Sequence, residues 1–165
     1  MNENKGLLEG IVVLDLTRVL AGPYCGTLIA DMGATVIKVE NPIGGDDSRS
    51  MGPFINGNSV YYANFNRSKL GCTLNLKTSE GKEIFKELVK KADIIIENYR
   101  PGTMEKLGLG YDELKKVNPA IIYGAVSGFG HTGPLSKRAG YDIIGQAMGG
   151  LMSTTGWPGG PATRS

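Results

Sequence analysis

Short apolar runs alternate with amphipathic segments along most of the chain, and this alternation predicts an α/β fold. The first apolar run covers Ile11–Leu16 and the second covers Thr35–Val39. The segment between them, Pro23–Met32, is compatible with a helix. Proline is tolerated in the first turn of a helix, and the apolar residues of the segment recur at helical spacing. Gly33 supplies a stop. Strand, helix and strand of this length form a right-handed βαβ unit, whose first loop lies at the ligand-binding carboxyl edge of the sheet.

The next hundred residues continue the pattern of alternating elements. Asn41–Arg49 is a loop by its proline, glycine and aspartate content. Ser59–Lys69 is aromatic and polar by turns and leads into Cys72–Leu76, which predicts a strand with one covered face. A helix capped by Thr78 or Ser79 should follow and end near Ala92.

Three further segments complete the expected domain. Asp93–Tyr99 and Ala120–Val126 are buried strands, and Tyr111–Val117 between them is a short helix that Asn118-Pro119 ends. A last helix is expected over Gly140–Met152. We therefore predict a Rossmann-like open, largely parallel sheet flanked by helices. Its ligand edge is built from the loops after Leu16, Glu40, Tyr99 and Val126.

Composition and charge exclude several classes of protein. With 165 residues, 41% hydrophobic and 21% charged, the chain suits one globular domain. A formal charge of +2 is too small to indicate nucleic acid or a membrane surface as a partner. Cys25 and Cys72 form neither a disulfide framework nor a metal cluster, and we expect no metal site. Without a signal peptide or a membrane-spanning run, we expect a soluble cytoplasmic protein.

Glycine is unusually abundant, at 25 residues, about twice the ordinary share of ~7%. The turn Ser127–Pro134 lacks the Gly-Lys-Ser/Thr of a phosphate-binding loop, and no G-x-G-x-x-G follows the first strand, which argues against a dinucleotide-dependent dehydrogenase. His131 is the only histidine, and its place in a glycine-rich turn is more typical of a loop residue than of a general base.

Several motifs together resemble the class III coenzyme A transferases, the CaiB/BaiF family. They are Leu8–Pro23, Leu28–Glu40, the F-N-x-x-K stretch from Phe65 to Lys77, the E-N-x-x-P-G segment from Glu97, and the R-x-G-Y-D-x-x-x-Q-A-x-x-G signature from Arg138. The resemblance covers nearly all of this chain but less than half of a full-length family member. It implies that residues 1–165 are the incomplete N-terminal coenzyme A-binding α/β domain of a larger transferase fold.

The resemblance also implies a set of coenzyme A contacts in the loops that follow the strands. These are Arg18, Leu20, Ala21, Lys38, Asn41, Leu74, Asn75, Leu76, Lys77, Asn98, Tyr99, Arg100 and Lys106. Asn41 stands where a family member has a phosphate-binding arginine, so Lys38 or Arg49 would have to compensate. Lys106 also replaces an arginine and keeps its charge, although lysine lacks bidentate phosphate geometry.

The implied activity moves coenzyme A between carboxylic acids through an aspartyl intermediate. The family's nucleophilic aspartate is expected beyond Ser165, so this chain alone should be inactive, with Tyr141 and Asp142 in supporting positions. Family racemases have histidine where this chain has Tyr141, which favours transfer. The alternatives are an acyl-CoA racemase of the same family or a non-catalytic module that binds coenzyme A or a nucleotide. The resemblance implies acyl-CoA and carboxylic acids as substrates, no permanently bound cofactor, and an interlocked homodimer for the full-length protein.

Overall fold

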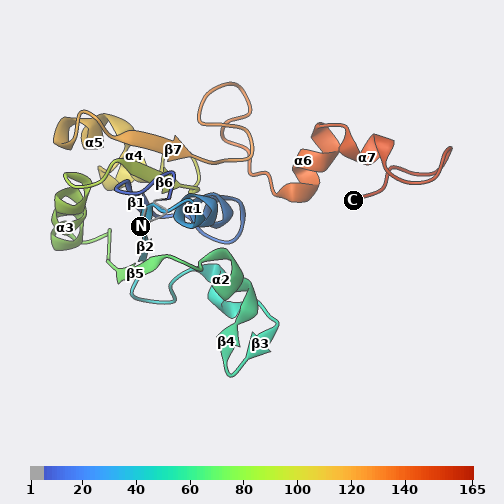
Figure 1. The fold of residues 1–165 in the computed structure, drawn as a ribbon. Coiled ribbons are helices and arrows are strands. Elements are labelled where there is room, and N and C mark those ends of the chain that lie inside the picture. Colours follow the sequence, from blue (N-terminus) through green and yellow to red (C-terminus); the bar gives the residue numbers. More distant parts are fainter. Residues whose placement is uncertain (1–5) are drawn as a thin grey trace. The chain divides into compact units, whose positions relative to one another are not determined.

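The computed structural model describes residues 6–165 and divides the chain into two compact units (Figure 1). The first unit continues to Val126, and the second unit is Ser127–Ser165. The first unit contains the predicted open α/β sheet. The second consists of loops and two short helices.

All five strands of the main sheet run parallel, as predicted. They are β1 (Val12–Asp15), β2 (Thr35–Glu40), β5 (Leu70–Thr73), β6 (Ile94–Glu97) and β7 (Ile122–Ala125), in the spatial order β5-β2-β1-β6-β7. Numbered along the chain within this sheet, the order is 3-2-1-4-5, which is that of a doubly wound fold. The order reverses between β1 and β6, so a crevice is expected at the carboxyl ends of these central strands.

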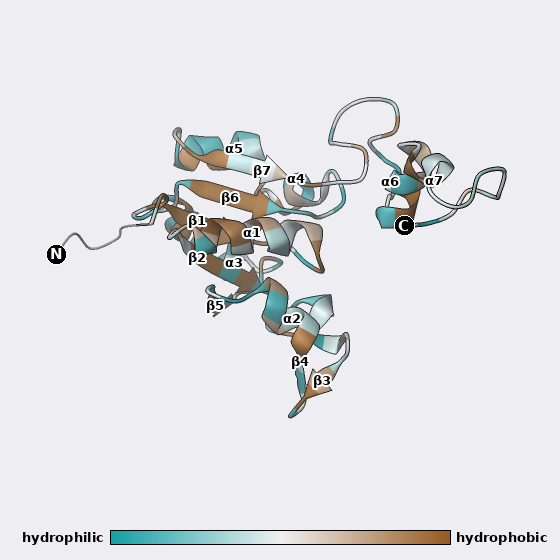
Figure 2. Cartoon of the chain, turned by 45° about the vertical axis from the view of Figure 1, so that its right-hand side comes forward, coloured by the Kyte–Doolittle hydropathy of each residue, from teal (hydrophilic) through white to brown (hydrophobic). Residues whose placement is uncertain are grey.

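Each face of the sheet buries its own apolar cluster. On one face, α1 (Ala21–Asp31) packs Ala30 against Val13, Val36 and Ile96. The central strands are apolar along most of their length, as Figure 2 shows, because helices cover both faces. Val13 and its neighbour in the sequence, Leu14, therefore belong to different clusters, since successive strand side chains point to opposite faces.

The other face is covered by α3 (Ser79–Val89), α4 (Thr103–Leu107) and α5 (Tyr111–Val117), which contribute Phe85, Met104 and Leu114 to the larger cluster. The bounds of α5 agree with the prediction. The predicted cap of α3 is also confirmed, because the Thr78 hydroxyl accepts a hydrogen bond from the Gly81 amide at 3.1 Å. The sequence pattern did not predict α4, whose five residues lie between two left-handed glycines, Gly102 and Gly108.

The predicted strand over Ser59–Lys69 is wrong. A hairpin of β3 (Phe54–Ile55) and β4 (Asn58–Ser59) leads into a helix, α2 (Val60–Phe65). The Ser59 hydroxyl caps this helix by accepting from the Tyr62 amide at 3.0 Å. The rings of Tyr61 and Phe65, four residues apart, meet edge to face with centroids 5.0 Å apart. The cap and the i, i+4 ring pair favour a helix over the strand that the alternation suggested.

The expected helix over Gly140–Met152 is divided in two. α6 (Asp142–Met148) and α7 (Leu151–Thr154) are separated at Gly150, which has a φ of 83°. A right-handed helix cannot pass through that conformation. Along the described part of the chain, no helix combines the length and the apolar character needed to cross a bilayer.

Candidate functional site

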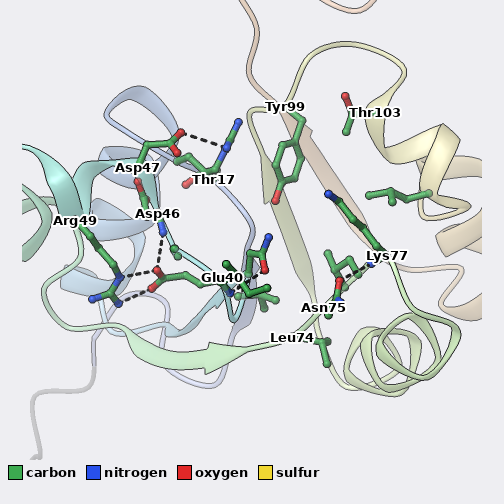
Figure 3. A pocket seen from close by; sticks show the side chains of 18 of the residues that line it. Thr17, Glu40, Asp46, Asp47, Arg49, Leu74, Asn75, Lys77, Tyr99 and Thr103 are labelled. Carbon is green, nitrogen blue, oxygen red and sulfur yellow. Dashed lines mark hydrogen bonds and ion pairs between the residues drawn. The ribbon is translucent and has the colours of Figure 1, made fainter.

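A pocket of about 700 Å³ opens where β1, β2, β5 and β6 end at the carboxyl edge of the sheet. Its walls come from the loops after these strands and from α4, which contributes Thr103 and Leu107. Figure 3 shows Glu40 and Arg49 on one side, Asn75 and Lys77 on the other, and the ring of Tyr99 between them. The pocket therefore lies at the edge that the βαβ pattern predicted.

Seven of the thirteen implied coenzyme A contacts line this pocket: Arg18, Asn41, Leu74, Asn75, Leu76, Lys77 and Tyr99. The segment from Leu74 to Lys77 extends directly from β5, and the Leu74 amide donates to the Glu40 carbonyl at 2.8 Å. This bond ties the segment to the end of β2. The Lys77 ammonium makes no ion pair with any residue from 6 to 165 and is exposed.

One wall of the pocket is stiffened by a cluster of Glu40, Arg49 and Tyr62. The Arg49 guanidinium donates to both carboxylate oxygens of Glu40, at 2.7 and 2.8 Å, and to the Tyr62 hydroxyl at 2.7 Å. The Tyr62 hydroxyl donates to Glu40 at 2.7 Å, and the guanidinium also lies 3.8 Å from the centre of the Tyr62 ring. Arg49 is therefore already neutralised, which makes it a poor replacement for the arginine missing at position 41.

The electrostatics of Glu40 follow from these contacts. Burial alone would raise the pKa of the Glu40 carboxyl, but hydrogen bonds from Arg49, Tyr62 and the Asp46 amide lower it to about 2. The same burial, together with the Glu40 charge, raises the pKa of the Tyr62 phenol above its usual value. The carboxylate and the phenol therefore keep these charge states across the neutral range.

Arg18 is held more weakly than Arg49, the other arginine of the pocket. Its guanidinium meets one oxygen of Asp47 at 3.2 Å, with both side chains about half exposed, and lies 5.3 Å from the centre of the Tyr99 ring. Exposed ion pairs of this kind contribute about 0–1 kcal/mol. Arg18 is thus able to exchange its carboxylate partner for a phosphate.

Lys38 does not face the pocket, although it was expected to compensate for Asn41. Its side chain is 2% exposed, and its ammonium donates to Asp46 at 2.7 Å and to the Thr17 carbonyl. Burying a charge requires a partner of opposite sign, and Asp46 supplies it. Lys38 is therefore not available to a phosphate in this arrangement.

The remaining implied contacts lie outside the pocket wall. Leu20 is the N-cap residue of α1, and Ala21 is its first residue. Asn98 binds the backbone of Arg18 instead of facing the pocket, while Arg100 and Lys106 are exposed and line no part of it.

The two supporting residues belong to the second unit. Tyr141 is the 83% exposed N-cap residue of α6, and Asp142 is the first residue of that helix and accepts from the Gln146 amide at 2.6 Å. The geometry of Asp142 is that of a carboxylate in the first turn of a helix, which the macrodipole favours.

Sequence reasoning missed the acidic side of the pocket. Glu40, Asp46 and Asp47 all line it, and Thr17 joins them from the first loop. The available signal was the pair of acidic residues directly after Gly44-Gly45, in the loop that follows a buried strand. Within residues 6–165, no group of histidine, cysteine, aspartate and glutamate side chains could hold a metal ion.

The lining suits a nucleotide-like ligand with phosphates. Arg18 and Lys77 supply positive charge. Leu74, Leu76 and the Tyr99 ring supply apolar surface elsewhere in the lining of the pocket. Burial raises the pKa of the Tyr99 phenol, so this ring stays neutral.

Comparison with known proteins was consistent across sequence and structure. The sequence model described as CoA-transferase family III matches residues 8–165. The chain is 50% identical over 160 residues to the acetyl-CoA:oxalate CoA-transferase of Acetobacter aceti, covering 97% of this chain and 41% of that protein. It is also 50% identical over 158 residues to the succinyl-CoA:glutarate CoA-transferase of Mus musculus, covering 95% of this chain and 36% of that protein.

A solved structure shares the fold. The crystal structure of a CAIB/BAIF family protein from Brucella suis superimposes with a TM-score of 0.92 at 44% identity, over 98% of this chain and 44% of that one. This chain thus spans less than half the length of the curated relatives and of the solved structure that it matches.

Proposed function

This chain belongs to CoA-transferase family III, and we propose that the full-length protein moves coenzyme A between carboxylic acids. The observation that carries the proposal is the pocket at the carboxyl edge, where two cations, Arg18 and Lys77, adjoin an apolar and aromatic wall. Coenzyme A combines an adenine, a pyrophosphate and a 3′-phosphate, and this lining matches those groups. The curated relatives named above are CoA-transferases, which supports the same activity.

The residues have distinct roles in the proposed complex. Arg18 and Lys77 neutralise phosphates, which are the charged groups that enter the pocket from solvent. Tyr99, Leu74 and Leu76 cover the adenosine end, since a flat ring and two leucines provide surface for a nucleobase. The proposed domain assignment, residues 1–165 as the coenzyme A-binding portion, follows from these roles.

The proposed chemistry uses an aspartate beyond Ser165. Its carboxylate attacks the acyl-CoA thioester, forming a mixed anhydride and releasing the coenzyme A thiolate. The thiolate then attacks the aspartyl carbonyl of the anhydride, which frees the donor acid and leaves an aspartyl-CoA thioester. The acceptor acid reverses these two steps, so that the new acyl-CoA leaves and the aspartate is regenerated. We propose that the 165-residue chain alone does not turn over.

Ligand choice is the first test of the proposal. Calorimetry should detect weak coenzyme A binding by the 165-residue chain and weaker or no binding of NAD. Lys77→Ala should weaken coenzyme A binding severalfold, because its ammonium has no ion-pair partner in residues 6–165 and faces the pocket. Lys91→Ala, which removes the same charge from an exposed position outside the pocket, is the matched control. Equal or tighter binding of NAD would overturn the assignment.

Lys106 requires its own comparison, because we propose that it meets the 3′-phosphate of coenzyme A although it lines no part of the pocket. If Lys106 meets that phosphate, Lys106→Ala weakens coenzyme A more than dephospho-coenzyme A. If Lys106→Ala lowers the affinity for the two ligands equally, Lys106 does not contact the 3′-phosphate.

The reaction itself is tested on a protein extended beyond Ser165. Incubation with acyl-CoA and hydroxylamine should trap the aspartyl intermediate as an inactivating hydroxamate, and replacing that aspartate with alanine should abolish exchange between acids. Exchange of α-deuterium without an acceptor acid would instead indicate a racemase. A tyrosine at position 141 argues against that outcome, because a phenol is a poor substitute for a histidine base near neutral pH.

The assembly and location of the full-length protein are also proposals. We propose a homodimer in the cytoplasm, acting on acyl-CoA and carboxylic acids without a permanently bound cofactor. Sedimentation of the extended protein is the direct measurement of its oligomeric state.

A further inference from the structure

Within the loop that joins β1 to α1, residues Thr17–Val19 are held by side chains at almost every backbone polar group. The Thr17 amide donates to Asp15 at 2.8 Å, and the Thr17 carbonyl accepts from the Lys38 ammonium. Asn98 binds both the amide and the carbonyl of Arg18, each at 2.7 Å. The side chains that hold this loop come from three strands or the ends of those strands.

The third residue of this segment, Val19, has a strained backbone and is also held by a side chain. Val19 has a φ of 69°, in the left-handed region, and its amide donates to the Asp46 carboxylate at 3.1 Å. A β-branched residue is a genuine outlier there, because its Cβ crowds the following carbonyl. Such a conformation persists only where surrounding contacts over-determine it.

Asp46 is well suited to supply that constraint. One carboxylate oxygen accepts from Val19 and from the amide and hydroxyl of Ser48, and the other accepts from Lys38 at 2.7 Å. Both Asp46 and Lys38 are 1% exposed. Burial alone would raise the pKa of Asp46, but hydrogen bonds from Lys38 and Ser48 hold it below its usual value. The carboxylate is thus charged and fixed on both oxygens.

The loop matters because it forms part of the pocket. Thr17 and Arg18 line it, and the Arg18 backbone is continuous with Val19. A change in φ at Val19 would redirect the chain on both sides, and with it the Arg18 guanidinium that faces the ligand. Neither Asp46 nor Lys38 makes a hydrogen bond or an ion pair with the Arg18 side chain; they act on it through this backbone, while the neighbouring Asp47 meets the guanidinium at 3.2 Å.

We propose that Asp46, held by Lys38, is a positioning residue that keeps Val19 left-handed and so sets where Arg18 meets the phosphates of coenzyme A. The inference rests on the proposed function for its ligand, but the loop geometry is independent of it. If the buried ion pair had only a structural role, its removal would lower the stability of the fold, and a change at Val19 would not compensate specifically.

The test uses glycine, which adopts a positive φ without strain. The paired variant Lys38→Met/Asp46→Asn removes both buried charges together, so that neither is left unpaired. It should bind coenzyme A about tenfold more weakly than the unchanged protein, the cost expected for losing a constrained left-handed residue. Adding Val19→Gly should restore binding to within about threefold, because glycine makes the constraint unnecessary.

A matched control separates positioning from stability. Val126→Gly makes the same valine-to-glycine change in the loop after β7, at a position without a positive φ, and should not restore binding. Calorimetry of all variants, with thermal unfolding in parallel, gives both readouts. Failure of Val19→Gly to restore binding, or restoration by Val126→Gly as well, overturns the proposal.

A second measurement needs neither the paired variant nor coenzyme A. In the unchanged protein, NMR should find the short intraresidue amide-to-Hα distance of a positive φ at Val19 and slow exchange of its amide. A negative φ or rapid exchange overturns the proposal even if coenzyme A binds. Absence of coenzyme A binding by the unchanged protein would instead contradict the proposed function and leave the loop geometry to be decided by this measurement.

Discussion

At the scale of single residues, the pocket contains a cation that already has an internal counter-ion. Arg18 meets Asp47 at 3.2 Å, and an entering phosphate must replace that carboxylate. Asp47→Asn should therefore tighten coenzyme A binding, about two- to fivefold at low ionic strength, because the variant removes a competing charge. Added salt should reduce the difference, since both side chains are about half exposed.

Calorimetry at low and high salt measures this gain. Asp112→Asn on α5 removes the same charge from a position that does not line the pocket, and it should leave affinity unchanged. Weaker binding by Asp47→Asn would mean that Asp47 orients Arg18 for the ligand and does not compete with it.

Glu40 makes stability depend on pH in the acid range. Its pKa is lowered to about 2 in the folded protein, so its hydrogen bonds stabilise the fold fully above its unfolded pKa near 4.5. That contribution, about 3 kcal/mol for a shift of this size, is lost progressively as pH falls from about 5 to 2. Glu40→Gln should lower the free energy of unfolding at neutral pH and make that free energy depend less on pH below about pH 5.

Denaturant unfolding between pH 7 and pH 2 measures both effects. Glu83→Gln, at an exposed carboxylate on α3, should leave the curve close to that of the unchanged protein. If the free energy of unfolding falls equally steeply with pH in Glu40→Gln, Glu40 is not the group responsible for the acid sensitivity.

At the scale of elements, the first turn of α3 supports the pocket from behind. A Cβ at Gly81 would overlap the backbone carbonyl of Asn75, which belongs to the pocket-lining segment. Alanine usually stabilises a helix relative to glycine by roughly 0.5–1 kcal/mol, but overpacking against backbone costs typically 1–3 kcal/mol. Gly81→Ala should therefore destabilise the protein and weaken coenzyme A binding together.

Thermal unfolding and calorimetry decide this point with a matched control. Gly71→Ala in β5 meets no atom within 4 Å and needs no positive φ, so it should be neutral or slightly stabilising. If Gly81→Ala behaves in the same way, the close approach of α3 to Asn75 does not constrain the pocket.

At the scale of the whole molecule, the two units contribute unequally to the core. Every buried hydrophobic residue among the described residues lies between Val13 and Ile121, in the first unit. All pocket residues lie there as well. Deleting residues 127–165 should therefore leave the midpoint of thermal unfolding within a few degrees and the coenzyme A affinity within about twofold. A large loss of either would show that the second unit stabilises the first.

The second unit carries the exposed apolar surface that we expect to drive self-association. Ile143, Met148, Leu151 and Trp157 are 48, 56, 49 and 89% exposed. Exposed apolar side chains of this kind favour association. Sedimentation should detect association of the 165-residue chain at high concentration and a monomer after deletion of residues 127–165. A monomer in both cases would contradict this expectation.

The sequence by itself determined the fold class of the first unit and the parallel direction of its strands, whereas the order of the strands came from the structure. Apolar runs such as Ile11–Leu16 and Thr35–Val39 are short, buried and joined by a helix-length segment, and only a parallel sheet with covered faces accommodates that pattern. The position of the pocket followed, because the loops after parallel strands meet at one edge. The Asn118-Pro119 stop likewise made α5 predictable, since its signal is local.

Only the tertiary structure decided which charges face the pocket. Lys38 and Lys77 are both lysines near the end of a strand, yet Lys38 is buried against Asp46 and Lys77 is exposed. Val60–Phe65 is a helix for a related reason, because its cap and its ring contacts outweigh a strand-like alternation. The physical cause is the same in each case. Periodicity fixes the face of an element, whereas the partner of a charge or a ring depends on segments brought together only by folding.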